Sequence, residues 1–252
     1  MANQEQEAME KRNRKTMHIE SILKKVQGRK EDRKQRKAIS QLQTIDNSEE
    51  MELNKKLLFN FMPVGYIPKP DQNDIIEKMI LYFNGDPKVE DYSISLDKGI
   101  CLMGNWGIGK TILFNAFRDY MRVLTYGNSN LFTITSMEDI ILELQNKGNM
   151  NRFTWNVIEL NYGVTQRNPQ NIVINEFGVK YDAKHFGSDI NELLDSFLMI
   201  RYEIFQSQRK LTHVTTNYDW KDISSNYDIR LHDRFKEMFN FIPFPGQTSL
   251  RK

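Results

Sequence analysis

The strongest constraint in this sequence is a glycine-rich segment, Gly104-Asn105-Trp106-Gly107-Ile108-Gly109-Lys110-Thr111, which fits the pattern G-x-x-x-x-G-K-[ST]. An apolar stretch, 99–103, comes directly before it, and a helical pattern beginning at Thr111 follows it. Glycines let the backbone curl so that successive N–H groups point at phosphate oxygens, and the next helix adds its positive N-terminal end. The segment therefore predicts a strand, a phosphate-binding loop and a helix in succession.

Two side chains of this loop have a defined chemistry. We expect Lys110 to reach the β- and γ-phosphates of a bound nucleotide, and the Thr111 hydroxyl to ligate Mg²⁺. Trp106 lies at a variable position of the pattern, where it stacks on a base or partner, or only fills space. The loop thus predicts ATP and Mg²⁺ as the bound groups.

Short apolar segments alternate with helical patterns along the rest of the chain, which is typical of a parallel sheet covered by helices. We expect helices at 73–83 and 188–207, and in the second of these Arg201 alone interrupts the apolar face. This pattern predicts an α/β fold. The expected strands are 99–103, 131–135, 171–174, 211–215 and a last one near 241–244.

The strand expected at 171–174 is followed by a polar pair, Asn175 and Glu176. Glu176 is placed to polarise an attacking water and to act as a general base. An aspartate would be expected at position 175 to hold Mg²⁺, and the neutral amide of Asn175 weakens either metal binding or turnover. An ordinary junction between a strand and a loop is the alternative interpretation of the pair.

Further candidate residues follow later strands and helices. Asn217 comes after the strand expected at 211–215, where its amide could sense a γ-phosphate or the attacking water. A helical segment, 230–238, places Arg230 and Arg234 on one face. Arg234 could reach a phosphate in a neighbouring subunit; surface salt bridges are the alternative. Arg251 is a possible third phosphate sensor, unless it belongs to an untethered terminus.

Positive charge is concentrated at the N-terminus. Residues 1–45 contain twelve lysines and arginines against six acidic residues, whereas the remainder contains 23 against 27. A short apolar stripe, Ile19, Ile22, Leu23 and Val26, offers a surface for docking on a partner. We therefore expect a basic, partly helical partner-binding arm over 1–50 and one ATPase domain over 51–252. Either a solvated arm or phosphate contacts with nucleic acid would explain its charge.

Several classes of protein are disfavoured by the same sequence. The longest uninterrupted apolar run, 79–83, is far shorter than the roughly 18 residues that span a bilayer. The first residues lack the apolar region of a secretory signal, so we expect a cytoplasmic protein without membrane contact. Cys101 is the single cysteine and lies in an apolar stretch, which favours a core residue over a nucleophile.

In this order the pieces resemble the AAA+ ATPases of the helicase-loader and transposition-helper group, the DnaC and IstB-like proteins. The resemblance implies that Asn217 is sensor 1, Arg234 the arginine finger and Arg251 the sensor 2 arginine. It departs from the family pattern at Asn175, which replaces the Walker B aspartate, and in the arm, which aligns with no motif. The resemblance covers roughly residues 95–252 and is carried by 99–104, 109–111, 174–178, 201–203, 212–217, Arg234 and Arg251.

Chain length adds to this picture. Only 35 residues follow Asn217, too few for the separate helical lid of most AAA+ proteins, so we expect little or no C-terminal lid. A core without a lid implies a homo-oligomer in which a neighbouring subunit completes each nucleotide site.

The resemblance implies an ATPase that binds a replicative DNA helicase and places it on single-stranded DNA. A transposition helper that assembles on DNA with a transposase is the alternative within the same fold. An adaptor that binds ATP but hydrolyses it weakly is a third reading, and Asn175 is the residue that favours it.

Overall fold

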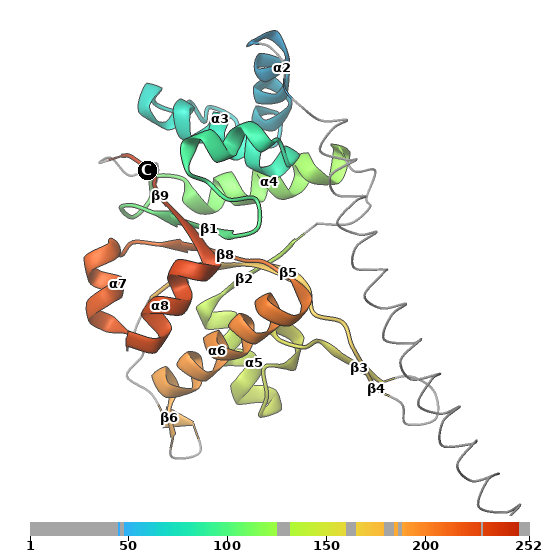
Figure 1. The fold of residues 1–252 in the computed structure, drawn as a ribbon, viewed down its shortest axis with the longest axis vertical. Helices are drawn as coiled ribbons and strands as arrows, with labels where there is room; N and C mark the ends of the chain where they lie inside the picture. The colour runs from blue at the N-terminus through green and yellow to red at the C-terminus, as the bar shows by residue number, and fades with distance from the viewer. Residues whose placement is uncertain are drawn as a thin grey trace, which may run out of the picture.

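A five-stranded parallel sheet forms the centre of the structure (Figure 1). The computed structural model describes residues 45, 48–124, 132–159, 165–178, 184–185, 188–227 and 229–246. The predicted arm, apart from Ile45 and 48–50, and Arg251 lie outside these residues. The strands run in the order β2-β5-β8-β1-β9, and every neighbouring pair is parallel. Their bounds are β1 (Gly99–Met103), β2 (Phe132–Ser136), β5 (Asn171–Phe177), β8 (Thr212–Thr216) and β9 (Phe239–Pro243).

Helices cover both faces of this sheet, which confirms the predicted α/β fold (Figure 1). One face carries α2 (Ser48–Phe59), α3 (Pro70–Asn84) and α4 (Lys110–Leu124). The other face carries α5 (Met137–Lys147), α6 (Ile190–Gln208), α7 (Trp220–Asn226) and α8 (Ile229–Met238). Two short 3₁₀ helices, η1 (Pro87–Tyr92) and η2 (Asn151–Phe153), complete the helical elements described. None of the described helices combines the length and apolar character needed to cross a membrane.

The central strands are apolar at successive positions because both of their faces are buried. Ile100 and Leu102 of β1 pack with the helices of one layer, while Cys101 between them packs with the other layer. Cys101 is buried, so it is a core residue, as predicted. This burial raises the pKa of its thiol. The same alternation places Val173 of β5 on one side and Ile172 and Ile174 on the other.

Some predicted boundaries need correction. The last strand is Phe239–Pro243 rather than 241–244, because it pairs along the whole length of β1, from Gly99 opposite Phe239 to Met103 opposite Pro243. The strand predicted at 171–174 extends to Phe177, and those predicted at 131–135 and 211–215 begin and end one residue later. The helix predicted from 73 starts at Pro70, since proline is well tolerated in the first helical turn.

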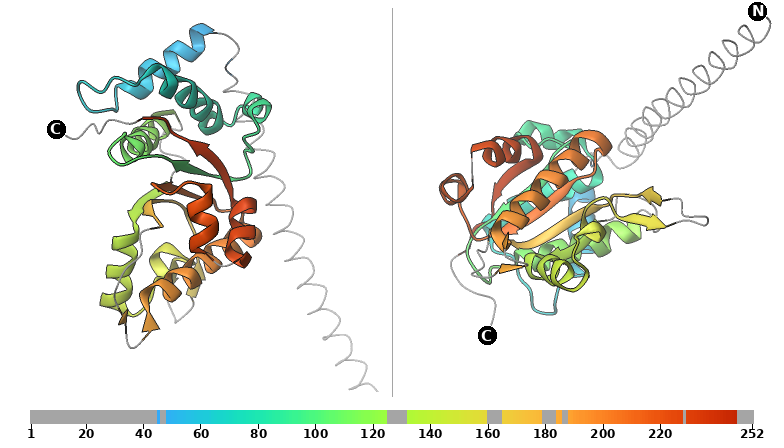
Figure 2. Two further views of the ribbon diagram at one scale, coloured as in Figure 1. Left: turned by 90° about the vertical axis from the view of Figure 1, so that its left-hand side faces the viewer. Right: turned by 90° about the horizontal axis from the view of Figure 1, so that it is seen from below.

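Two small antiparallel hairpins were not predicted from the sequence. One pairs β3 (Val157–Glu159) with β4 (Thr165–Arg167) and projects from the body of the protein before β5 (Figure 2). The other pairs β6 (Lys184–His185) with β7 (Ser188–Asp189). Because β7 takes up residues 188–189, α6 begins at Ile190 rather than at 188.

The chain is attached to the core at Ile45, ahead of α2. Its backbone N–H donates to Asp86 Oδ2 at 2.8 Å, and its carbonyl accepts from Lys88 Nζ at 2.5 Å. The Ile45 side chain is buried in the same apolar cluster as α2, α3 and α4. Ile45 is therefore fixed to the core beside η1.

Arg201 is the unexpected feature of the core. This arginine of α6 is completely buried, and burial lowers the pKa of its guanidinium to about 9. Its Nε donates to Thr212 Oγ1 at 2.9 Å, and its Nη2 donates to the carbonyls of Gln170 at 3.0 Å and Leu211 at 3.2 Å. Its Nη1 donates to the carbonyl of Phe153 at 3.2 Å. Arg201 thus ties α6 to the amino ends of β5 and β8.

His213, the next residue of β8 after Thr212, is also a core residue. Its Nδ1 accepts from the backbone N–H of Ile100 at 3.1 Å, so the ring is neutral. Burial, and to a smaller extent the charge of Arg201, lower its pKa to about 3. Within the described residues no group of three or more His, Cys, Asp or Glu side chains is placed to hold a metal ion.

Replacement of Arg201 by methionine is expected to destabilise the fold. The carbonyls of Phe153 and Gln170 would lose a buried donor, so the free energy of unfolding should fall by about 3 kcal/mol. Urea denaturation of the full chain measures it. Arg209→Met is the control, because Arg209 is exposed and only lies over the Phe205 ring at 5.8 Å. Equal losses in both variants would contradict a structural role for Arg201.

Candidate functional site

The glycine-rich loop joins β1 to α4 at the carboxyl edge of the sheet, as predicted. Its glycines adopt backbone conformations that other residues rarely reach, with φ of 155° at Gly104, 73° at Gly107 and 101° at Gly109. At Gly104 a Cβ atom would lie 2.4 Å from the carbonyl oxygen of Phe244, so only glycine fits. The helix that follows begins at Lys110, one residue earlier than expected.

Lys110 is the buried charge at the centre of this edge. Its side chain is 7% exposed. Its Nζ donates to the carbonyls of Gly104 at 2.6 Å and Asn105 at 2.7 Å, and to Asn217 Oδ1 at 2.8 Å. These three acceptors match the three N–H donors of an ammonium group. Burial lowers the pKa of Lys110 to about 8, and the negative charge of Glu176 opposes this shift.

Asn217 reaches Lys110 because of the strand order. It follows β8, which lies directly beside β1, and the backbone N–H of Gly104 donates to the carbonyl of Thr216 at 3.1 Å. The pairing of the two strands thus continues into the first residue of the loop. The structure brings together two residues that are 107 positions apart in the sequence.

Asn175 and Glu176 lie near the carboxyl end of β5, on the other side of β8. The side chain of Asn175 is half-buried and that of Glu176 is exposed. Asn175 Oδ1 accepts from the hydroxyl of Thr215 at 3.3 Å. Glu176 has a positive φ of 58°, which is uncommon for a residue with a side chain.

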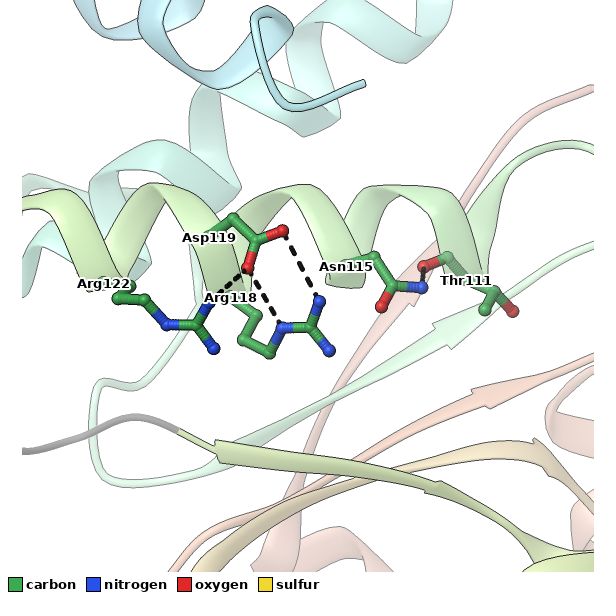
Figure 3. A network of polar contacts seen from close by, with 5 residues as sticks. All are labelled: Thr111, Asn115, Arg118, Asp119 and Arg122. Atoms are coloured by element: carbon green, nitrogen blue, oxygen red, sulfur yellow. Dashed lines mark hydrogen bonds and ion pairs between the residues drawn. The ribbon is translucent and has the colours of Figure 1, made fainter. Parts of the chain in front are cut away.

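A divalent cation at this edge would be held by oxygen ligands. The Thr111 hydroxyl and the Asn175 carbonyl oxygen, the two predicted ligands, are oxygen groups of the type that Mg²⁺ accepts. Thr111 is exposed at the start of α4, where Asn115 Nδ2 donates to its backbone oxygen at 3.0 Å rather than to its hydroxyl (Figure 3). Neither of these two predicted ligands carries a negative charge.

An ionic network lies farther along α4 from Thr111 (Figure 3). Arg118 Nε lies 3.2 Å and Arg122 Nη1 3.3 Å from Asp119 Oδ1. One carboxylate is therefore shared by two guanidinium groups, which leaves this face of α4 with a net positive charge.

The segment after β9 passes along the loop, a feature that the sequence analysis missed. The backbone N–H of Phe244 donates to the carbonyl of Met103 at 2.6 Å, and Asn105 Nδ2 donates to the carbonyl of Gly246 at 3.1 Å. Gln72 of α3 binds the same segment through the carbonyl of Pro245 at 2.8 Å. The Pro-Gly pair at 245–246 marks a turn in the sequence, but nothing in the sequence links it to the loop.

Two other residues of the loop, Ile108 and Trp106, differ in how far they are buried. Ile108 is buried and packs beside Gly246, where a Cβ atom would lie 2.9 Å from the Ile108 side chain. Trp106 is 61% exposed, so it does not fill space in the core. Arg251 lies outside the described residues.

Arg234 is held against α6 of its own chain. Its Nη1 lies 2.8 Å from Met199 Sδ, and its guanidinium lies over the Tyr202 ring at 5.1 Å from the centroid. Arg230, one turn earlier on α8, is exposed. The structure therefore does not bring Arg234 to Lys110 of the same chain, and its predicted role toward a neighbouring subunit stays a prediction.

Comparison with known proteins finds solved structures of similar fold. No family model and no curated protein matches the sequence. Among solved structures, a candidate primosome component from Streptococcus pyogenes serotype M3 is similar, with a TM-score of 0.51 and 15% identity over 85% of this chain and 98% of that chain. The DnaC helicase loader has a TM-score of 0.49 and 18% identity over 75% of this chain and 99% of that chain. DnaI has a TM-score of 0.44 and 14% identity over 77% and 92%, respectively. At the level of the fold, the predicted parallel α/β sheet flanked by helices is confirmed.

Proposed function

We propose that this chain binds ATP with Mg²⁺ at the carboxyl edge of the sheet and hydrolyses it slowly. The observation that carries the proposal is the hydrogen bond of 2.8 Å between Lys110 and Asn217 beside a loop of three glycines with positive φ. The bond joins the buried ammonium of Lys110 to the side-chain amide of Asn217. Beside them, the backbone N–H groups of the loop can surround a phosphate.

The residues of the site have distinct roles in this proposal. The loop amides and Lys110 bind the β- and γ-phosphates, and Asn217 exchanges its contact with Lys110 for one with the γ-phosphate or the attacking water. Glu176 accepts a proton from that water as it attacks the γ-phosphorus, and the bond from this phosphorus to the bridging oxygen of ADP breaks. When bound, Mg²⁺ neutralises charge on the phosphate oxygens. Thr111 and Asn175 help to hold it.

Asn175 is the reason to expect slow turnover. Its carbonyl oxygen carries no formal charge and already accepts from Thr215 at 3.3 Å, so it is a weaker cation ligand than a carboxylate. This residue also supports the alternative, a nucleotide-binding adaptor in which binding rather than hydrolysis is the functional event.

For the biological role we propose the loading of a replicative helicase onto single-stranded DNA. The support is the resemblance in sequence motifs together with the structural likeness to a candidate primosome component. In this proposal the basic arm predicted over residues 1–50 binds the helicase. Subunits associate so that Arg234 and Arg251 reach a neighbouring phosphate. A transposition helper that assembles on DNA with a transposase is the second candidate.

The variant Lys110→Ala should bind ATP more weakly. Because hydrogen bonds to charged groups contribute about 1.5–3 kcal/mol, the Kd should rise by about tenfold to a hundredfold in calorimetric titration. Lys98→Ala is the matched control, since Lys98 precedes the opposite end of β1 and its Nζ donates to the carbonyl of Lys236 at 2.8 Å. Unchanged affinity in Lys110→Ala would reject this site.

The variant Arg234→Ala should keep its ATP affinity and lose ATPase activity by about a thousandfold if the guanidinium acts on a neighbouring subunit. Mixing it with Glu176→Gln should restore part of the activity, because some interfaces would then carry both intact residues. Arg230→Ala, on the same helix, controls for the loss of surface charge. Without any restoration, Arg234 would serve only the packing of α8 on α6.

Affinity capture with ATP should recover a hexameric replicative helicase on the full chain. A full-length variant with eight basic residues of the arm changed to serine should recover less, because its contact surface loses its charge. Recovery of a transposase would move the role to transposition, and recovery of neither would favour the adaptor. The eight residues are Lys24, Lys25, Arg29, Lys30, Arg33, Lys34, Arg36 and Lys37.

A further inference from the structure

The pairing of β5 with β8 is interrupted next to Glu176. The register runs regularly to Ile174 opposite Val214 and resumes with Phe177 opposite Thr216. Two residues of β5, Asn175 and Glu176, therefore face a single residue of β8, Thr215. This is a β-bulge, a device that bends a strand locally and redirects its side chains.

The hydroxyl of Thr215 contacts both residues of the bulge. It accepts from the backbone N–H of Glu176 at 3.2 Å and donates to Asn175 Oδ1 at 3.3 Å. The direction is fixed because a backbone N–H can only donate, which leaves the hydroxyl hydrogen for the amide oxygen. Thr215 is 1% exposed, so water does not compete for either bond.

Glu176 needs this support because its backbone is strained. A φ of 58° in a residue other than glycine costs on the order of 1–3 kcal/mol and persists only where the surroundings enforce it. The surroundings do so from two sides. Thr215 holds the backbone N–H of Glu176, and Gly178 packs so closely on Tyr218 that a Cβ atom there would lie 2.6 Å from its ring.

We infer that Thr215 is a positioning residue, whose hydroxyl holds the bulge so that Glu176 and Asn175 face the phosphate-binding loop. The inference rests on the proposed function, since it concerns the same site. It assigns to Thr215 a role that acts through Asn175 and Glu176. The negative charge of Glu176 partly opposes the burial that lowers the pKa of Lys110, which agrees with a carboxylate directed to that side.

The kinetic test compares Thr215→Val, Thr215→Ser and Thr154→Val in the full chain. Valine keeps the shape of the side chain without its hydroxyl, and a small misplacement of a reacting group costs up to about a hundredfold in rate. We expect kcat to fall by about tenfold to a hundredfold in Thr215→Val, with KM for ATP unchanged, and to recover in Thr215→Ser. Thr154→Val removes an equally buried hydroxyl, bonded at 3.0 Å to the carbonyl of Met150, and should keep the wild-type kcat.

Two kinetic outcomes would overturn the inference. One is a wild-type kcat in Thr215→Val; the other is a parallel loss in Thr215→Val and Thr215→Ser together with a lower melting temperature, which would mark a purely structural role. A chain that binds ATP without hydrolysing it would overturn the proposed turnover instead.

A crystal structure of Thr215→Val tests the inference independently of turnover. We expect Glu176 to leave the left-handed region and the register of β5 to shift at the bulge. An unchanged bulge with Glu176 still near a φ of 58° would show that the hydroxyl of Thr215 does not position it.

Discussion

The position of β8 between β1 and β5 is the constraint on which the rest of the structure depends. In a parallel sheet the carboxyl ends of neighbouring strands meet at one edge, where ligands bind in open α/β folds. The strand order therefore places β8 beside both the phosphate-binding loop and the Asn175-Glu176 pair. The end of β8 contacts each of them, since Asn217 accepts from Lys110 and Thr215 bonds both residues of the pair. One strand thus connects the cationic and the anionic side of the site.

The amino end of β8 explains why this connection is held in one register. Thr212 accepts from the buried guanidinium of Arg201, and His213 accepts from the backbone of Ile100. Gly99 allows an approach to the Thr212 carbonyl that a Cβ atom, at 1.8 Å, would prevent. A slip by one residue would exchange the two faces of the strand and break all three contacts. Polar groups far from the site thereby determine which residues meet at it.

The parts of this arrangement that the sequence predicted depend on local signals. The glycine pattern located the loop, and apolar segments located all five strands of the central sheet to within three residues at either end. The sequence did not reveal the bulge or the role of Thr215, because these depend on the register between two distant strands. Arg201 stood out as a break in an apolar helix face, yet its four acceptors come from three separate segments. The hairpin of β3 and β4 was missed because its strands are only three residues long.

In the proposed function, the charges at the carboxyl edge favour nucleotide binding over turnover. Burial lowers the pKa of Lys110, and the negative charge of Glu176 opposes this shift. An aspartate at position 175 would add a second negative charge, which would strengthen cation binding and repel an incoming triphosphate. Asparagine keeps the bond to Thr215 without that charge. With asparagine at position 175, the triphosphate meets less electrostatic repulsion. Mg²⁺, which assists cleavage, is then held by a neutral amide oxygen instead of a carboxylate. In the proposed function, Asn175 therefore favours the nucleotide-bound state over its hydrolysis.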